Sequence, residues 1–583
     1  MTRQGKGAGV AGAMWTFAIR PLLLSALLLG GVTSMPAAAG EDRDRDDGPV
    51  VQTAEGPVRG FVKNGVYEFL GIPYAAPPVG GLRWMPPQPV APWGAPRDAT
   101  AFGNICAQVT TLAVFAGPAS IAEDCLFLNV FTTRLGKGNG NRAGGLPVFV
   151  WIHGGGNVDG TSGDYDGSKL ATGGPLGTPT VVVTLNYRLG LFGFLAHPAL
   201  DAEGHLFANY GILDIQAVLR WVQRNAAAFG GDPNTVTLGG QSAGAQDTGV
   251  NVISPLAKGL FNRAIYESSP LSALTPLSIG LTRGQNFAAA AGCPGTDATT
   301  AACLRALTAP QILQLQGTAN ANGPYVTGPM VDGIIMPVTP ITAWTTGQFN
   351  HMPTMGGNVQ DEANFGIGNT EYFTGPPQVP MTAAQYTAAV TATYSGAEYP
   401  GGPNYPAGTA AAVLAQYPPG ANPQATFDLV GTDPGACRNR HVDALWAKAG
   451  VATYAYEFDD RQAPYYYPAM PGFTPLAAHT IDIQFLFPGW HGGILGVSGA
   501  SQSPGLTASE ERLSDELVAA WTNFARSGNP NGTGNAPWPR FVGQEGVPEI
   551  LSENVPSLST FTNAQFGAEH NCAFWDTILV YQP

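Results

Sequence analysis

The sequence lacks long apolar runs and has few charged residues. Only 12% of its 583 residues are charged, whereas 44% are hydrophobic. An intrinsically disordered chain has the opposite balance, so disorder is excluded as a description of the whole protein. No stretch approaches the roughly 20 consecutive apolar residues that a membrane-spanning helix needs. We therefore expect a large folded protein with a sizeable core and no stable membrane anchor.

Basic residues are also scarce. The net charge of −14 results from 27 Lys and Arg residues against 41 Asp and Glu residues, and the chain contains no long basic run. A chain with this balance repels the phosphate backbone of DNA or RNA. We therefore expect no nucleic-acid partner.

The six cysteines show none of the spacings that are typical of a metal site. No C-x-x-C or H-E-x-x-H pattern occurs, so no metal ligand is predicted. An even number of cysteines is typical of an exported protein with disulfides, although six cysteines allow fifteen connectivities. The simplest pairing joins chain neighbours and leaves the last two to each other: Cys106–Cys125, Cys293–Cys303 and Cys437–Cys572.

The N-terminus has the pattern of a secretory signal. Arg3, Lys6 and Arg20 accompany no acidic residue, an apolar run follows over residues 22–32, and small residues occupy 37–39. This order of charged, apolar and small-residue segments is typical of a cleaved signal peptide. We predict a signal peptide over residues 1–39 and a single domain over residues 40–583. The expected location is therefore outside the cell or in the periplasm.

The middle of the chain alternates between strand-like and helix-like segments. Residues 146–152 and 180–185 are continuous apolar runs, which predict strands buried on both faces. Residues 210–229 have apolar side chains at helical spacing, and residues 235–238 form a third strand-like run. Strands that alternate with helices indicate a parallel sheet. The expected fold class is α/β, with a large, mostly parallel central sheet flanked by helices.

The regions on either side of this core differ in character. Residues 50–74 alternate apolar and polar residues between glycines, which predicts a small N-terminal antiparallel sheet. Residues 510–524 are amphipathic and have Gly528 just past their end, as a helix does. Residues 366–435 are rich in Gly, Pro, Thr and Ala and have weak periodicity. We interpret this last segment as a variable region over the sheet edge.

A single G-x-S-x-G pattern occurs, at residues 240–244, with Ser242 at its centre. It follows the predicted strand 235–238 and can open a helix. A sharp turn between a strand and a helix needs glycine where side chains would collide, and it exposes the serine hydroxyl at the sheet edge. The turn also puts Ser242 at a helix N-terminus, where the dipole stabilises a developing anion. Ser242 is therefore the candidate nucleophile, and the alternative is an ordinary glycine-rich turn.

A second glycine-rich motif follows the predicted strand 146–152. It consists of His153, Gly154, Gly155 and Gly156. Without Cβ atoms, the N–H groups of Gly155 and Gly156 can approach a substrate oxygen. Together with the N–H group of Ala243, which follows the nucleophile, they would form an oxyanion hole. Alone the motif is better explained as a flexible turn, but two such motifs after two buried strands favour catalysis.

Several longer segments resemble one known family. They are Phe69–Ala75, Glu123–Asn129, Asn186–Phe194, Phe229–Pro233 and Trp521–Asn531. With these segments, nearly all of the mature chain is similar to the type-B carboxylesterases, which include the cholinesterases. The resemblance implies the α/β-hydrolase fold and the hydrolysis of carboxylic esters.

By this resemblance Ser242 is the nucleophile, Glu362 is the acid and His479 is the base of a catalytic triad. The chemistry requires the same parts, because a serine hydroxyl is a poor nucleophile until a neutral imidazole takes its proton. A buried carboxylate then fixes the tautomer of that imidazole. No cofactor is expected for this reaction.

Neighbouring residues are alternatives for two of these roles. His441 and His491 are alternatives to His479 as the base. Asp361 is the alternative to Glu362, because spacing cannot separate adjacent residues. We prefer Glu362 on the resemblance alone.

The resemblance also assigns supporting roles. Ser268 is similar to a second hydroxyl that lies near the catalytic histidine and acid in the family. The three cysteine pairs named above match the family pattern, and each disulfide contributes on the order of 2–4 kcal/mol to the stability of an exported fold. The resemblance further implies two ion pairs, Arg83–Glu123 and Arg188–Asp214.

The chain departs from the family at the residue before the nucleophile. That residue is commonly Glu, but it is Gln241 here, so a negative charge is missing beside the site. The loop from Cys106 to Cys125 also contains no Trp, on which the cholinesterases stack the choline cation. Both changes weaken cation binding, through lost Coulomb and cation–π attraction. We therefore expect small or aromatic neutral esters as substrates.

Two other functions are compatible with the sequence. Some members of the family have lost the serine and serve as adhesion or binding modules, although all three triad positions are filled here. A lipase would need an apolar lid over its site, and residues 365–386 are the candidate lid, although they are polar and rich in Gly. The expected partner is a small-molecule ester. No sequence feature indicates the oligomeric state.

Overall fold

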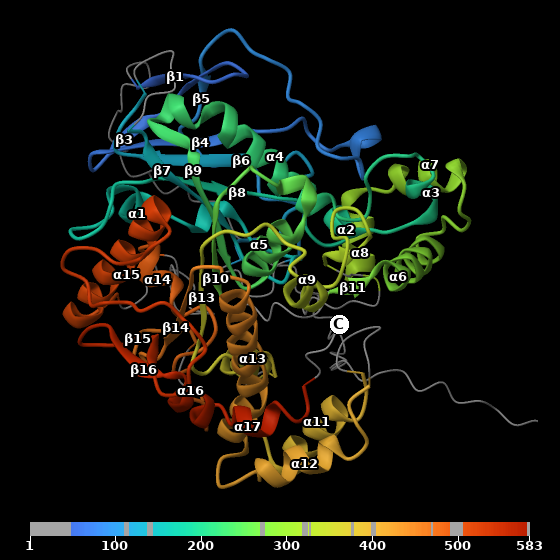
Figure 1. The fold of residues 1–583 in the computed structure, drawn as a ribbon. Helices are drawn as coiled ribbons and strands as arrows, with labels where there is room; N and C mark the ends of the chain where they lie inside the picture. Colours follow the sequence, from blue (N-terminus) through green and yellow to red (C-terminus); the bar gives the residue numbers. More distant parts are fainter. Residues whose placement is uncertain are drawn as a thin grey trace, which may run out of the picture.

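A large central sheet organises the molecule (Figure 1). The computed structural model describes residues 48–109, 116–136, 144–268, 274–317, 325, 328–374, 378–397, 404–467, 470–489 and 505–579. Within these residues the sheet has eleven strands. From one edge to the other they are β16 (Ser559–Thr562), β15 (Pro548–Glu553), β14 (Thr453–Phe458), β13 (Thr354–Val359), β10 (Arg263–Glu267), β9 (Gly231–Gln241), β7 (Leu146–Ile152), β8 (Val181–Leu185), β6 (Phe127–Thr132), β4 (Val66–Pro73) and β3 (Phe61–Lys63).

The strands from β15 to β8 run parallel to their neighbours. The outer pairs at both edges are antiparallel. Two smaller sheets accompany the central one. They are formed by β1 (Val50–Gln52), β2 (Pro57–Arg59) and β5 (Arg97–Asp98), and by β11 (Thr275–Pro276) and β12 (Met330–Val331).

Helices connect the parallel strands and cover both faces of the sheet. The α-helices are α1 (Ser168–Thr172), α2 (Gly190–Phe194), α3 (Pro198–Asp201), α4 (Tyr210–Asn225), α5 (Ala243–Ile253), α6 (Leu277–Ala290), α7 (Ala298–Ala306), α8 (Ala309–Gln316), α9 (Pro340–Thr346), α10 (Asn364–Phe373), α11 (Ala383–Tyr394), α12 (Thr409–Gln416), α13 (Pro423–Lys448), α14 (Ile483–Leu486), α15 (Ala508–Ser527), α16 (Asn563–Glu569) and α17 (Cys572–Trp575). Short 3-10 helices occupy Gly80–Leu82, Ser162–Asp164, Ala226–Phe229 and Pro255–Ala257.

The two helical layers have different members. Helices α4, α5 and α13 contact the sheet or one another on one side, and α1 and α15 contact it on the other (Figure 1). The apolar stripe of α4, which includes Ile212, Ile215 and Leu219, is fully buried. The helix α15 begins at a Thr507 capping box and ends at Gly528 in the left-handed conformation. These start and stop signals are what the sequence leads one to expect.

The predicted α/β architecture is confirmed, and a small N-terminal sheet of three strands accompanies the central sheet. Residues 50–74 contribute to both sheets, because β3 and β4 join the edge of the central one. The remaining strands β1 and β2 are antiparallel and β5 pairs parallel to β2. The segment 366–435 contains four helices or parts of them, from α10 to α13. Its periodicity is weak because α13 buries polar side chains such as Asp428 and Asp433 and contains Pro434.

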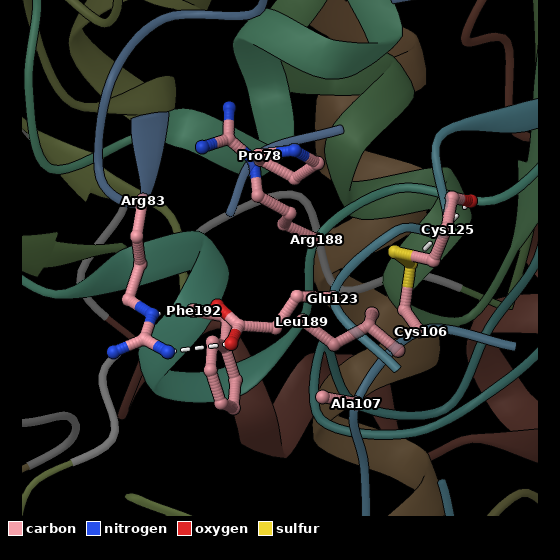
Figure 2. A pocket seen from close by; sticks show the side chains of 9 residues that line it. All are labelled: Pro78, Arg83, Cys106, Ala107, Glu123, Cys125, Arg188, Leu189 and Phe192. Atoms are coloured by element: carbon pink, nitrogen blue, oxygen red, sulfur yellow. Dashed lines mark hydrogen bonds and ion pairs between the residues drawn. A yellow bond between two sulfur atoms is a disulfide. The ribbon is translucent and has the colours of Figure 1, made fainter. Parts of the chain in front are cut away.

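Figure 2 shows the surroundings of the first disulfide, Cys106–Cys125. Beside it Arg83 donates two hydrogen bonds to Glu123, from Nε at 2.6 Å and from Nη2 at 2.5 Å. Arg188 lies across a small cavity of about 10 Å³ in the same view. That volume holds about one water molecule, so the region is a packed support and offers no ligand site.

Covalent and ionic links stabilise other parts of the chain. The structure also contains the disulfides Cys293–Cys303 and Cys437–Cys572, so its three disulfides join the cysteine pairs named in the sequence analysis. Arg188 and Asp214 form a buried bidentate pair with N–O distances of 2.8 and 2.7 Å. Three disulfides are typical of a protein from an oxidising compartment. Every helix in the described part of the chain is too short or too polar to cross a lipid bilayer. The predicted signal peptide at 1–39 lies outside the described residues.

His570 links three segments that are distant in the sequence, because it lies between α16 and α17 and contacts α13 and β14. Helix α17 lies close to α11 and α12 at one end of the molecule (Figure 1). His570 follows α16, and its Nδ1 atom lies 3.0 Å from Asp433 Oδ1 on α13. Its Nε2 atom lies 2.6 Å from Glu457 Oε1 on β14. Burial opposes a charge on this imidazole, but the two carboxylates raise the pKa of His570 to about 10. The protonated imidazole therefore holds two buried carboxylates together at neutral pH.

This arrangement predicts that stability falls at alkaline pH. Because the pKa of His570 is higher in the folded than in the unfolded protein, its proton stabilises the folded state. This contribution is complete below the ordinary pKa of about 6.5 and is lost as pH rises through about 10. Between these limits one bound proton corresponds to about 1.4 kcal/mol per pH unit. We expect the free energy of unfolding, measured in urea from pH 7 to pH 10, to fall more steeply in the wild type than in the double variant Asp433→Asn, Glu457→Gln. Equal slopes would contradict a charged His570.

Candidate active site

Ser242 occupies a strained turn between β9 and α5. Its backbone has φ 56° and ψ −122°, a conformation that residues other than glycine rarely adopt. The turn passes very close to the end of β7, because a Cβ atom on Gly240 would lie 2.4 Å from the carbonyl oxygen of Ile152. A Cβ atom on Gly244 would lie 2.1 Å from the same oxygen. The two glycines of the motif are therefore required by packing, and the turn has the geometry of a nucleophile elbow.

The glycine-rich segment after β7 lies against this turn. A Cβ atom on Gly154 would be 3.1 Å from the Cβ atom of Ser242. Gly155 and Gly156 have φ angles of 106° and 61°, which favour glycine. None of the hydrogen bonds between described residues uses the N–H groups of Gly155, Gly156 or Ala243. Three unpaired backbone donors therefore lie beside the Ser242 turn.

Neighbouring parallel strands bring the remaining groups to the same edge of the sheet. Ser242 follows β9, Ser268 follows β10 and Glu362 comes three residues after β13, while the glycine segment follows β7. These four strands are adjacent in the order β13, β10, β9, β7. Ligand sites in open α/β sheets occur at the carboxyl ends of the strands, as here.

His479 reaches this edge from a loop after β14. Its Nδ1 atom lies 2.5 Å from Glu362 Oε2, and Glu362 Oε1 accepts a hydrogen bond from the Val359 N–H group at 3.1 Å. Burial opposes a charge on the imidazole, but the Glu362 carboxylate and its hydrogen bond raise the pKa of His479 above its ordinary value. Glu362 therefore orients the imidazole and stabilises its protonated form.

Two backbone hydrogen bonds hold the loop that carries His479. Asp361 accepts a hydrogen bond from the Ala477 N–H group at 3.1 Å and pairs with Arg461 at 2.7 and 2.8 Å. The Tyr465 hydroxyl donates to the carbonyl oxygen of His479 at 2.7 Å. Asp361 thus positions the loop, and its neighbour Glu362 contacts the imidazole.

Gln241 contacts the other nitrogen of this imidazole. Its Nε2 atom lies 3.1 Å from His479 Nε2. Since the Nδ1–H group faces the Glu362 carboxylate, Nε2 carries the lone pair and accepts from the Gln241 amide. Among the described residues Ser242 Oγ makes no hydrogen bond in this state. Catalytic hydrogen bonds of this kind often form only when substrate is bound.

The groups meet in one cavity of about 330 Å³. Its lining includes the sequence-predicted residues Ser242, Ala243, Gly156, Ser268, Glu362 and His479. The cavity therefore brings together residues from six separate segments of the chain.

Sequence analysis did not predict that α13 forms one wall of the cavity. Five residues of α13 line it, together with Gln246 and Asn358. The five are Gly431, Thr432, Gly435, Ala436 and Asn439. Because α13 has little amphipathic character, its existence and its contact with the site had no clear signal in the sequence.

A group of buried carboxyls behind the site was also missed. Burial and the nearby Glu362 carboxylate raise the pKa of Asp482 to about 7. Burial and the charge of Asp482 raise the pKa values of Glu267 and Glu553 well above their ordinary range. One oxygen of Glu267 accepts a hydrogen bond from Trp521 Nε1 at 2.6 Å. Their raised pKa values reduce the ionised fraction of these carboxyls, and the charge that Asp482 carries contributes to the raised pKa of His479.

The structure also places Ser268 and the alternative bases His441 and His491 of the sequence analysis. The Ser268 hydroxyl is buried and has no partner in the described part of the chain, so it bonds to neither His479 nor Glu362. His441, one alternative to His479 as the base, lies on α13 and is absent from the described lining of the cavity. His491, the other alternative, lies outside the described residues. The tyrosines 465–467, which precede His479 in the chain, are buried and pack in the hydrophobic core.

Comparisons with known proteins agree with this geometry. The sequence model of the carboxylesterase family matches residues 47–575. Carboxylesterase 1E of Mus musculus is 33% identical over 599 residues, which cover 96% of this chain and 98% of the relative. Fumonisin B1 esterase of Sphingopyxis macrogoltabida is 33% identical over 553 residues, covering 93% and 91% of the two chains.

A solved structure, of a thermophilic PNB esterase, has a similar fold. It superposes with a TM-score of 0.69 at 27% identity and covers 89% of this chain and 99% of its own. The family match spans the sheet, the serine turn, the histidine loop and the C-terminal helices. The chain therefore belongs to the carboxylesterase family and is a carboxylic-ester hydrolase.

Proposed function

We propose that this protein hydrolyses small or aromatic neutral esters through an acyl-enzyme on Ser242. The observation that carries the proposal is the cavity that Ser242 shares with the His479–Glu362 pair. The unpaired N–H groups of Gly155, Gly156 and Ala243 support it, because they are the donors that a developing oxyanion needs.

The proposed reaction has two steps. In the first, Ser242 Oγ attacks the ester carbonyl and its proton moves to His479 Nε2, which then gives the proton to the leaving alcohol. In the second, water attacks the acyl-enzyme while His479 again serves as base, and the acid and free Ser242 are released. Glu362 holds the imidazole in the tautomer that leaves Nε2 free to accept. Substrate binding must therefore turn His479 Nε2 from the Gln241 amide toward Ser242.

We further propose that the chain is exported as a single domain over residues 40–583 after removal of residues 1–39. The N-terminal pattern and the three disulfides support this. Recovery of active protein that still begins at Met1 would contradict the cleavage.

Replacement of the nucleophile tests the proposal directly. Ser242→Ala removes the attacking oxygen and is expected to lower kcat for p-nitrophenyl butyrate by roughly 10⁴–10⁶-fold. The matched control is Ser395→Ala, an exposed serine at the end of α11, which should retain wild-type activity. Labelling with a fluorophosphonate should also disappear in Ser242→Ala alone. Retained hydrolysis in Ser242→Ala would exclude the assignment.

The pKa of His479 predicts the pH dependence of catalysis. Only the neutral imidazole accepts the serine proton, so kcat/KM for a neutral ester should rise with pH, with a midpoint above the ordinary value of about 6.5. In Glu362→Gln the carboxylate is lost while burial remains, so the midpoint should move to lower pH. The plateau should fall by roughly 10²–10⁴-fold, because the imidazole is no longer held in the active tautomer. An unshifted midpoint in a pH–rate profile would show that another group sets the pKa.

The amide at position 241 predicts poor use of cationic esters. Gln241→Glu restores a carboxylate beside His479 Nε2, and it should raise the kcat/KM ratio of butyrylcholine to its neutral isostere 3,3-dimethylbutyl butyrate several-fold. The same charge should raise the pKa of His479 and move the pH–rate midpoint upward. The neutral ester serves as the internal control for general damage. No change in the ratio would remove the electrostatic explanation of substrate preference.

A further inference from the structure

The wall that α13 contributes to the active-site cavity is made of small residues with one exception. Gly431, Thr432, Gly435 and Ala436 are followed one turn later by Asn439. Gly431, Gly435 and Asn439 recur every four residues, as do Thr432 and Ala436, so the five positions share one face of the helix. Their small side chains leave room for substrate, and Asn439 supplies a full amide at one end of the wall.

Asn439 differs from Thr432 and Asn358 in the same lining because its amide has no partner among the described residues. Thr432 Oγ1 accepts from the Ala363 N–H group and donates to Asp428. Asn358 Nδ2 donates to the carbonyl oxygen of Val359. The Asn439 Oδ1 atom is buried, and neither end of its amide bonds to any residue that the structure describes.

An unpaired amide in this position is costly. A buried polar group without a partner loses its hydrogen bonds to water and gains none in return, which destabilises the folded state. The Ser268 hydroxyl, which lines the same cavity, is a second buried group without a partner among the described residues. Two unpaired polar groups in one substrate cavity point to hydrogen-bonding groups on the substrate itself.

The charge of the lining restricts the chemistry of that substrate. Among the described lining residues Glu362 and His479 can carry charge, and neither Lys nor Arg occurs. A carboxylate on the substrate would therefore find no cationic partner, and an ammonium group would compete with His479 for Glu362. A neutral hydroxyl both donates and accepts, so it can pair with either end of the Asn439 amide.

We propose that Asn439 is a specificity-determining residue that binds a neutral hydroxyl group of the ester. The preferred substrates are then hydroxylated neutral esters rather than esters of plain hydrocarbon chains. This inference rests on the proposed function of the cavity. It adds a second recognition point, on α13, to the reacting groups at the sheet edge. An ester with a methyl group in place of the hydroxyl leaves the amide unpaired and binds less well.

The experiment compares pairs of esters in which a hydroxyl replaces a methyl group of similar size. Methyl 4-(hydroxymethyl)benzoate and methyl 4-ethylbenzoate probe the acyl side. The monobutyrate of 1,4-butanediol and pentyl butyrate probe the alcohol side. In at least one pair the wild type should favour the hydroxylated ester about tenfold in kcat/KM, the value expected for one hydrogen bond.

Variants then assign the preference to the amide. Asn439→Leu has a similar volume without polar atoms, and it should bring the preferred ratio to one or below. Asn439→Asp keeps an acceptor of the same shape and should retain most of the preference. Asn404→Leu, which changes an exposed asparagine outside the cavity, should keep the wild-type ratio. Ratios within each enzyme are independent of the amount of folded protein.

The outcomes separate this inference from the proposed function. If hydrolysis of both esters depends on Ser242 but the ratio is the same in wild type and Asn439→Leu, the amide binds only solvent and the inference is wrong. A wild-type preference for the methyl partner in both pairs would also overturn it. If hydrolysis does not depend on Ser242, the proposed function fails as well.

Discussion

The active site depends on the close approach between the end of β7 and the turn that carries Ser242. The carbonyl oxygen of Ile152 occupies the space where Cβ atoms would stand on Gly240 and Gly244. This contact forces the serine into a backbone conformation with positive φ. The same contact brings the glycine segment after β7 to the side of the serine, where the N–H groups of Gly155 and Gly156 have no partner among the described residues. Strain at one residue is thus the consequence of packing that also builds the proposed oxyanion site.

The acid and the base are held by a different device. Glu362 and His479 are 117 residues apart in sequence, yet Asp361 bonds to the backbone beside His479 and an isolated bridge joins it to Ala478. The neighbour of the acid therefore anchors the loop of the base. Because both partners are attached at the backbone, the orientation of the imidazole does not rely on its own side-chain contacts alone. This explains why Asp361, paired with Arg461, supports the geometry without contacting the imidazole.

The parts that the sequence predicted correctly share a local origin. Buried parallel strands require continuous apolar runs, and β7 and β8 match their predicted segments within one residue. The residues around Ser242 can be recognised in the sequence because the sharp turn tolerates only glycine at two positions. Ser242, Glu362 and His479 were grouped only through the family resemblance. Their closeness in space depends on the order of strands that are distant in the sequence, which no local pattern reveals.

The parts that the sequence could not predict are those in which tertiary contacts override local pattern. Helix α13 has Pro434 inside it, glycines on one face and buried aspartates, so neither propensity nor periodicity marks it. Its stability comes from neighbours, among them His570, which pairs with Asp433, and the disulfide from Cys437. The same features that hide α13 from sequence analysis give it a narrow, small-residue face toward the cavity.

Electrostatic balance connects the fold to the choice of neutral substrates. The proposed reaction needs His479 to be neutral before attack and charged in the transition state, and Glu362, with a smaller contribution from Asp482, already raises its pKa. Each further anion nearby would hold the imidazole in its charged form and remove the base. The amide of Gln241 adds no charge beside the imidazole, and burial raises the pKa values of Asp482, Glu267 and Glu553, which reduces their ionised fraction. The proposed preference for neutral esters follows from this balance, and the proposed hydrogen bond from α13 would then add recognition that needs no charge.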